Sequence, residues 1–128
     1  MIDRRAAHQG APADDGPIYA DSFLVVTRTH QPDGLRFSGE IDINNSSAVA
    51  EALRRGFPNG GDHHIDLRSL LFCDISGIRA FVDAGRELEP GHQLRLHGLP
   101  KPLERVMQVT GWSDLPWLAM CTCTMDQE

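Results

Sequence analysis

The chain has 128 residues, a length that fits one domain at the usual ~100–200 residues per domain. Its residues are 41% hydrophobic and 23% charged, which is enough apolar content for an ordinary core. Eighteen acidic against twelve basic side chains give a net charge of −6, with histidines counted as neutral. This balance argues against a nucleic-acid binder, which needs a basic stripe over the phosphates, and against anchoring on an anionic membrane.

The sequence predicts no membrane or targeting segment. No stretch approaches the ~20 apolar residues that cross a bilayer, and the N-terminal segment lacks the apolar run of a secretory signal. The cysteines (Cys73, Cys121 and Cys123) are odd in number, and their spacing suggests no disulfide framework. We therefore expect a cytoplasmic protein.

Composition divides the chain into a central domain and two tails. Residues 1–17 are rich in Ala, Asp, Gly and Pro and lack apolar periodicity, which predicts a flexible N-terminal tail. Residues 121–128 form a short C-terminal tail of similar character. The domain is therefore expected over residues 18–120.

The domain is predicted to open with a hairpin and a helix. Phe23–Thr29 is a β-branched, apolar run typical of a strand, and Gln31–Gly34 supplies turn chemistry. Leu35–Ile41 alternates apolar with charged or polar residues, which predicts a second strand with one solvent-facing side. Asn45 or Ser46 can cap the helix that follows. The apolar positions of this helix are Val49, Ala52, Leu53 and Phe57.

A short strand and a second helix come next. His64–Leu67 alternates as a strand does, with Ile65 and Leu67 on one face. A helical spacing of apolar residues begins after Asp74, and Pro90 and Gly91 end that helix. The apolar residues of its face are Ile78, Phe81, Val82, Gly85 and Leu88.

The last elements complete an α/β (α+β-like) pattern. Leu94–His97 reads as a strand, a third helix opens near Pro100 or Pro102 and ends at Gly111, and Leu115–Leu118 can add a closing strand. The order β-β-α-β-α-β-α predicts a mixed four- to five-stranded sheet. Helices are expected on one face only, because the second and fourth strands keep charged residues on the other. The third helix is expected to bury Leu103, Val106 and Met107.

The segment Leu70–Ile78 is the strongest candidate for a functional site. A strand ends, a short apolar loop follows and a helix begins around Asp74–Ser76, and the carboxyl ends of strands in open α/β sheets are where sites form. The first N–H groups of a helix lack intrahelical partners and favour negative charge. Ser76 is therefore suited to carry a phosphate. Capping of the helix by Asp74 or Ser76 explains the same residues more simply.

Enzymatic and cofactor chemistry finds little support. Ser76 is not placed as a hydrolase nucleophile, because Asp74 stands where the elbow motif needs its first glycine. No glycine-rich phosphate cradle is present, so no cofactor is predicted. Asp42, at the end of the second strand, can bind a partner or orient a hydroxyl, but capping the next helix is the commoner role.

No metal site is predicted either. His63 and His64 are adjacent, so in a strand they point to opposite faces and do not readily share an ion. Cys121 and Cys123 lack the spacing of structural zinc ligands. Cys73 is expected to be a small core residue.

Four short motifs follow one another along the chain, each separated from the next by a predicted element. They are Gly39–Asp42, Ile65–Leu67, Phe72–Ile78 and Leu103–Trp112. In this order they resemble STAS domains, and in particular the anti-sigma factor antagonist group of that family. The resemblance covers about residues 20–118 and implies the STAS fold.

The resemblance implies a partner-switching protein and no enzymatic activity. Antagonists of this type bind an anti-sigma factor that is also an ATP-binding serine kinase, and so free the sigma factor. Phosphorylation of a serine at the start of the second helix releases the antagonist, and a serine phosphatase resets it. The matching serine is Ser76; the acidic residue of the first family motif matches Asp42, and Asp74 matches the residue before the serine pair.

These matches predict one partner-binding surface. A phosphate on Ser76 would add a dianion beside Asp74 in a patch that binding has to desolvate, and Arg79, one turn on, is placed to neutralise part of it. Ile75 departs from the small or hydroxyl residue that the family often carries before the acceptor. A monomer or a weak dimer is expected. The surface comprises Asp42, Asp74, Ile75, Ser76, Gly77 and Arg79.

Two alternatives remain open at this point. STAS domains also act as scaffolds that are not phosphorylated, including soluble subunits of lipid-transport ABC systems and modules proposed to bind nucleotides; co-purification with an ATPase component would indicate this role. A small enzyme using Asp42, Asp74 and Ser76 for acid–base or phosphoryl chemistry is the other alternative. Nucleotide turnover by the purified protein would indicate it.

Overall fold

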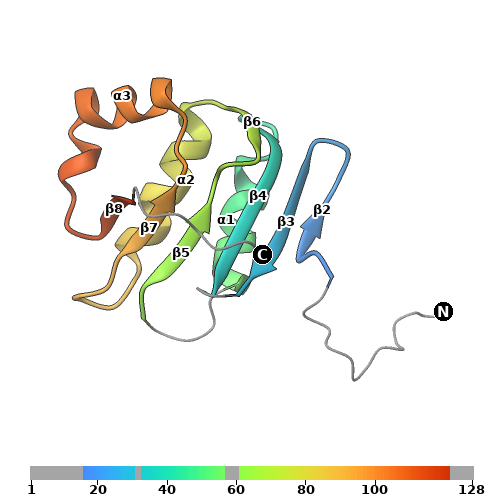
Figure 1. The fold of residues 1–128 in the computed structure, drawn as a ribbon, viewed down its shortest axis with the longest axis horizontal. Coiled ribbons are helices and arrows are strands. Elements are labelled where there is room, and N and C mark those ends of the chain that lie inside the picture. Colours follow the sequence, from blue (N-terminus) through green and yellow to red (C-terminus); the bar gives the residue numbers. More distant parts are fainter. Residues whose placement is uncertain (1–15, 31–32, 57–60, 122–128) are drawn as a thin grey trace.

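The computed structural model describes residues 16–30, 33–56 and 61–121, which form a seven-stranded sheet and three α-helices (Figure 1). The strands are β2 (Tyr19–Ala20), β3 (Leu24–Thr29), β4 (Gly34–Ile41), β5 (His63–Asp66), β6 (Leu70–Cys73), β7 (Leu94–His97) and β8 (Leu118–Cys121). The helices are α1 (Ser46–Gly56), α2 (Ile75–Arg86) and α3 (Lys101–Thr110), followed by the 3₁₀ turn η3 (Trp112–Asp114).

The sheet is mixed, with spatial order β2-β3-β4-β5-β7-β8. β2, β3 and β4 pair antiparallel, while β5, β7 and β8 continue the sheet in parallel. β4 is longer than its neighbour: its first residues pair with β5, and its last residues pair with β6, which places Cys73 beside Ile41. The ends of β4 and β6 therefore lie together at one end of the sheet.

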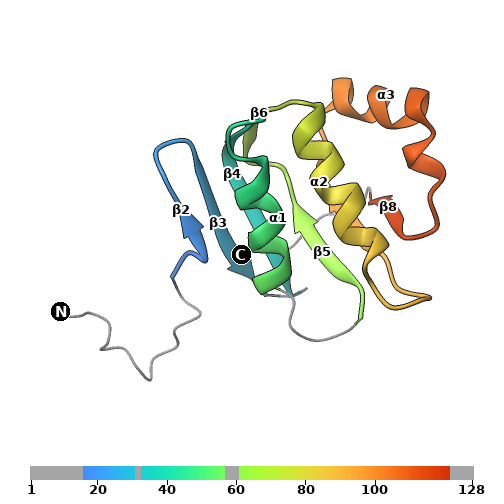
Figure 2. The ribbon, with the colours of Figure 1, turned by 180° about the vertical axis from the view of Figure 1, so that it is seen from behind.

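Helices α1 and α2 lie side by side on the same face of the sheet (Figures 1 and 2). They begin at the same end, because each follows one of the two adjacent parallel strands, β4 and β6. Phe37 of β4 and Phe81 of α2 meet edge to face in the core, with ring centroids 5.3 Å apart. The predicted coverage of one face by helices is confirmed for α1 and α2, and α3 lies toward the β8 edge.

The sheet has more strands than the four or five predicted. β2 was missed because two residues are too short to show any alternation. β6 was predicted to be a loop, because its four residues are not alternately buried and exposed: the two in the middle face outward. The closing strand is β8, which begins at Leu118, whereas the prediction placed it over Leu115–Leu118. The segment between α3 and β8 contains the 3₁₀ turn η3.

The predicted helices form, but α2 ends at Arg86, before the expected stop at Pro90 and Gly91, so Leu88 lies beyond the helix and is half-buried. Gly77, Ile78, Phe81, Val82 and Gly85 are buried along α2, and Val49, Ala52 and Leu53 along α1. In α3, Leu103 and Met107 are buried but Val106 is only half-buried. α3 begins after Pro100 and ends at Gly111, whose φ of 84° suits a left-handed cap.

Several predictions fall outside the described residues. These are the N-terminal tail up to residue 15, the part of the first turn at residues 31–32, Phe57 with the helix stop that follows it, and residues 122–128 with Cys123. Cys121, assigned to the C-terminal tail, is the last residue of β8. Within the described part of the chain, no helix has the length and apolar character required to span a bilayer.

Candidate functional site

Asp74 caps α2 and also holds the hydroxyl of Ser76. Its Oδ1 accepts hydrogen bonds from the main-chain N–H groups of Ser76 at 2.9 Å and Gly77 at 3.3 Å. The same oxygen accepts the Oγ–H of Ser76 at 2.5 Å. Of the two capping residues that the sequence left open, Asp74 is the cap. Ser76 is half-buried at the start of the helix, with its hydroxyl already hydrogen-bonded to a carboxylate.

The start of α2 is fastened to the end of β4. The N–H of Asp74 donates to the carbonyl oxygen of Ile41 at 3.1 Å. A Cβ on Gly77 would lie 2.6 Å from both Cys73 Sγ and Ile41 Cγ2, so only a glycine lets the helix approach this closely. The position of Ser76 is therefore fixed by the packing of Gly77 against the sheet.

Asp42 shapes the neighbouring loop between β4 and α1. Its carboxylate accepts the N–H of Asn44 at 2.8 Å, and its own N–H donates to Oδ1 of Asn45 at 2.9 Å. The amide of Asn45 in turn donates to the carbonyl of Glu40 at 2.9 Å. Asp42 is thus a turn-forming residue, and the carboxylate stays half-buried beside the end of β4.

A groove of about 350 Å³ runs between α1 and α2 from this end of the sheet. Ser76 and Arg79 line it from α2, and Ser46, Ser47 and Arg54 line it from α1. Of the predicted surface, therefore, Asp74, Ser76 and Gly77 are in direct contact, and Arg79 shares the groove with Ser76. Asp42 lies on the adjacent loop and is linked to this cluster through Ile41.

Large apolar side chains are exposed around the same end. Ile75, just before Ser76, is 56% exposed, and Ile43 in the loop after β4 is 75% exposed. Leu71 and Phe72 of β6 are also exposed. Exposed apolar side chains grouped near a candidate site are typical of surfaces that bind another protein.

Cys73 is a packing residue and not a reactive thiol. It is buried beside Ile41, and its Sγ donates weakly to the carbonyl of Asp74 at 3.5 Å. Burial, reinforced by the charge of Asp74, raises the pKa of the thiol to about 12. The thiol is therefore protonated at neutral pH, in agreement with its predicted role in the core.

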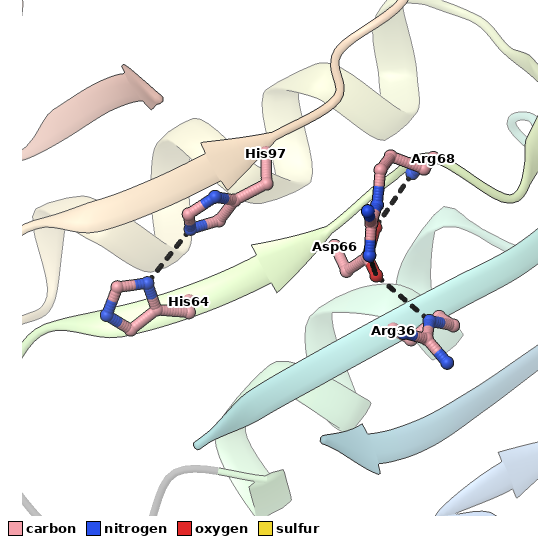
Figure 3. Close-up of polar contacts among 5 residues, drawn as sticks. All are labelled: Arg36, His64, Asp66, Arg68 and His97. Atoms are coloured by element: carbon pink, nitrogen blue, oxygen red, sulfur yellow. Dashed lines mark hydrogen bonds and ion pairs between the residues drawn. The ribbon is translucent and has the colours of Figure 1, made fainter. Parts of the chain in front are cut away.

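The sequence interpretation missed a buried ion-pair cluster on the sheet face away from α1 and α2 (Figure 3). Asp66 of β5 is fully buried and accepts from Arg36 Nε at 2.9 Å and from both Nε and Nη2 of Arg68 at 2.9 Å. Burial alone would raise the pKa of Asp66, but the hydrogen bonds from Arg68 and Arg36 outweigh it and hold the pKa at about 2. The signal available in the sequence was an acidic residue between Ile65 and Leu67 in a central strand.

Two histidines meet on the same face. Nδ1 of His64 lies 2.9 Å from Nε2 of His97, and the ring centroids are 5.1 Å apart (Figure 3). Burial, together with His97 and Arg95, lowers the pKa of His64. His97 lies on the sheet face that was expected to carry no helices, yet it is buried, with the ring of His64 beside it.

The adjacent histidines do face opposite sides, as predicted. His63 lines a second cavity beside α1 and α2, whereas His64 reaches His97 on the other face. Across the described ranges, no three His, Cys, Asp or Glu side chains are grouped so that they could hold a metal ion.

Comparison with known proteins assigns the chain to a family. The family model described as "Mlab, STAS domain" matches residues 24–119, so the chain belongs to the STAS domain family. The anti-sigma-B factor antagonist of Bacillus subtilis (strain 168) is 28% identical over 82 residues, which is 63% of this chain and 75% of that protein. Its counterpart in Listeria monocytogenes serovar 1/2a is 35% identical over 80 residues, 61% of this chain and 70% of that protein.

A solved structure agrees with the fold. The crystal structure of an anti-sigma factor antagonist from Mycobacterium paratuberculosis superposes with a TM-score of 0.57 and covers 75% of this chain and 83% of its own. At 20% sequence identity this likeness supports the fold alone. The family assignment makes the chain a regulatory binding protein and not an enzyme.

Proposed function

We propose that the chain is an anti-sigma factor antagonist that is switched off by phosphorylation of Ser76. Unmodified, it binds an anti-sigma factor that is also an ATP-binding serine kinase, and so releases the sigma factor in the cytoplasm. The observation that carries the proposal is the hydroxyl of Ser76, half-buried at the start of α2 and held 2.5 Å from Oδ1 of Asp74. The relatives named anti-sigma-B factor antagonists support the general role.

The surface around Ser76 has the chemistry of a protein-binding surface. Ile43, Leu71, Phe72 and Ile75 are all more than half exposed. Their burial under a partner would contribute ~25 cal/mol for each Å² of apolar surface removed from water. Binding over these side chains would also remove Ser76 from water, so the interface senses the charge state of that residue.

Phosphoryl transfer to Ser76 forms one bond and breaks one. Ser76 Oγ attacks the γ-phosphorus of ATP bound to the kinase, the Oγ–P bond forms, and the bond from the γ-phosphorus to the bridging oxygen breaks to release ADP. The hydroxyl proton leaves toward a base, and the carboxylate of Asp74 is already hydrogen-bonded to it. A serine phosphatase reverses the modification by transferring the phosphoryl group to water.

The modified protein is expected to bind its partner much more weakly. A phosphoserine carries about −1.5 to −2 charges at neutral pH, and here it would stand beside the carboxylate of Asp74. An unpaired charge buried in an interface commonly costs ~2–5 kcal/mol, which lowers affinity by a factor of tens to thousands.

The test uses tagged wild-type, Ser76→Ala and Ser76→Asp proteins in a lysate of the native cell supplied with ATP. With ATP present, we expect wild type to gain one phosphate by intact mass and the two variants to gain none. In a parallel lysate depleted of ATP, where wild type stays unmodified, we expect wild type and Ser76→Ala to retain an ATP-binding kinase that Ser76→Asp does not. Ser113→Asp, in η3, is the matched control because it adds the same charge away from α2 and should bind like wild type. Equal retention by Ser76→Asp and wild type would contradict the proposal, and capture of an ATPase without any phosphate gain would favour the unmodified scaffold.

A further inference from the structure

Arg79 lies on the groove that Ser76 lines and has no acidic partner among the residues that the structure describes. Asp83, one turn further along α2, pairs with Arg86 at 3.3 Å, not with Arg79. Arg54, the other arginine of the groove, pairs with Glu51 at 2.6 Å. Among the described residues, no ion pair or hydrogen bond involves the Arg79 side chain, which is exposed at the groove.

Hydroxyl groups face Arg79 from the other wall. Ser46 and Ser47 belong to the first turn of α1 and line the same groove as Ser76 and Arg79. Within the described part of the chain, neither hydroxyl makes a hydrogen bond to another side chain. The groove, at about 350 Å³, is within the ~300–1,000 Å³ range of ligand pockets and easily contains a phosphate group.

We propose that this groove receives the phosphate carried by Ser76, which Arg79 and the hydroxyls of Ser46 and Ser47 hold within the same molecule. The inference rests on the proposed function, because it takes Ser76 as the modified residue. A phosphate offers only acceptor oxygens near neutral pH. A guanidinium and two hydroxyls supply the matching donors.

The existing contact of Ser76 indicates which way the phosphate turns. The hydroxyl now donates its proton to Asp74 at 2.5 Å. A phosphorylated Oγ has no proton to donate, so this contact is lost and the phosphate is repelled by the carboxylate. Ser76 also lines the groove between α1 and α2, two helices that begin at the same end of the sheet (Figure 2). Arg79 lines that groove too and forms no ion pair among the described residues, so the groove offers the phosphate a cation in place of a carboxylate.

This arrangement gives the modification a second effect besides added charge. The bound phosphate would fill the end of the α1–α2 groove and neutralise Arg79. A partner that uses the groove or Arg79 as a contact would then lose both at once. Phosphorylation therefore changes the shape as well as the charge of the surface.

The experiment installs phosphoserine at position 76 during translation, so it needs no kinase. The second ionisation of the phosphate is followed by ³¹P NMR titration in the wild-type background, in Arg79→Gln and in Arg105→Gln. Arg105 is the matched control, because it is an exposed arginine of α3 that forms no ion pair among the described residues. We expect Arg79→Gln to raise the phosphate pKa by about half a unit or more, and Arg105→Gln to leave it unchanged.

A second variant tests the contribution of the two hydroxyls separately from that of Arg79. Ser46→Ala/Ser47→Ala removes both hydroxyls and should also raise the phosphate pKa while leaving Arg79 in place. Identical titrations in wild type, Arg79→Gln and the double variant would overturn the inference. That result would not affect the proposed function, which is tested separately by partner binding and by the gain of phosphate in the unmodified protein.

Discussion

The N–H of Asp74 donates to the carbonyl oxygen of Ile41 across 3.1 Å, and this one bond joins the two loops of the candidate site. Ile41 ends β4 and precedes Asp42, while Asp74 follows β6 and caps the helix that carries Ser76. The two loops are therefore held together through the main chain, and the geometry of the surface also depends on buried residues behind it.

Gly77 is the first such residue. In Gly77→Ala, the new Cβ would lie 2.6 Å from Cys73 Sγ and Ile41 Cγ2, so α2 has to move away from the sheet. Overpacking of this kind costs ~1–3 kcal/mol, partly offset by the better helix propensity of alanine. We expect urea denaturation to show a lower free energy of unfolding. Gly16→Ala is the control, because a Cβ there meets nothing within 4 Å; equal stability of the two variants would contradict the packing argument.

Two substitutions of Asp74 distinguish its role as a helix cap from the effect of its charge. Asp74→Ala removes the acceptor for the N–H groups of Ser76 and Gly77 and should lower the free energy of unfolding by ~0.5–2 kcal/mol. Asp74→Asn keeps an oxygen in the same place, and asparagine caps helices about as well as aspartate. Thermal melts of the two variants should therefore differ clearly. If asparagine destabilises the protein as much as alanine does, the capping role assigned to this side chain is wrong.

The helices and the hairpin could be predicted from the sequence because their signals are local. The spacing of Ile78, Phe81 and Val82 specified the buried face of α2, and Asp74 was one of two expected caps. β6 could not be recognised, since it pairs only with the end of β4 and its exposed Leu71 and Phe72 break the alternation. Strand identity there is decided by a distant partner, not by its own residues.

The sequence predicted which segment carries the candidate site, but not which distant residues lie beside it. The contact between Asp74 and Ser76 joins residues two positions apart and follows from an ordinary cap. The groove that Ser76 shares with Ser46 and Arg79 depends on how two helices lie against each other, which no local pattern contains. The ion pair between Arg36 and Asp66 likewise depends on the register of β4 against β5, which places the two residues opposite each other.

Asp66 should be one of the least replaceable polar residues. It is fully buried and accepts from both Arg36 and Arg68, so Asp66→Ala leaves two guanidinium groups beside an empty buried site. Loss of one member of a fully buried ion pair costs ~3–5 kcal/mol, and the cost here should lie below that range because Arg36 and Arg68 are 25% and 41% exposed and can be rehydrated. We expect a large fall in the free energy of unfolding, measured in urea. Asp114→Ala, an exposed acidic residue of η3, should change it by less than ~0.5 kcal/mol.

Asp66 also predicts how stability depends on acid pH. Its pKa is held at about 2 in the folded protein, below its ordinary value of 3.8. The unfolded chain therefore binds the proton first, and this stability is present above pH ~4 and lost as pH falls toward 2. The free energy of unfolding of wild type should decline over this interval. The Asp66→Ala variant should show a flatter dependence, and parallel curves would show that other carboxylates cause the decline.

His64 extends the pH dependence into the neutral range. Burial and the neighbouring His97 and Arg95 lower its pKa from 6.5 in the folded protein, so the folded state prefers the neutral imidazole. The unfolded chain takes up the proton first, and the resulting stability is present above pH ~6.5 and lost as pH falls through the lowered folded pKa. Melting temperatures should fall between pH 7.5 and pH 5. His64→Gln should flatten this slope, whereas His30→Gln, at an exposed histidine, should retain it; a slope unchanged by His64→Gln would assign the effect to another group.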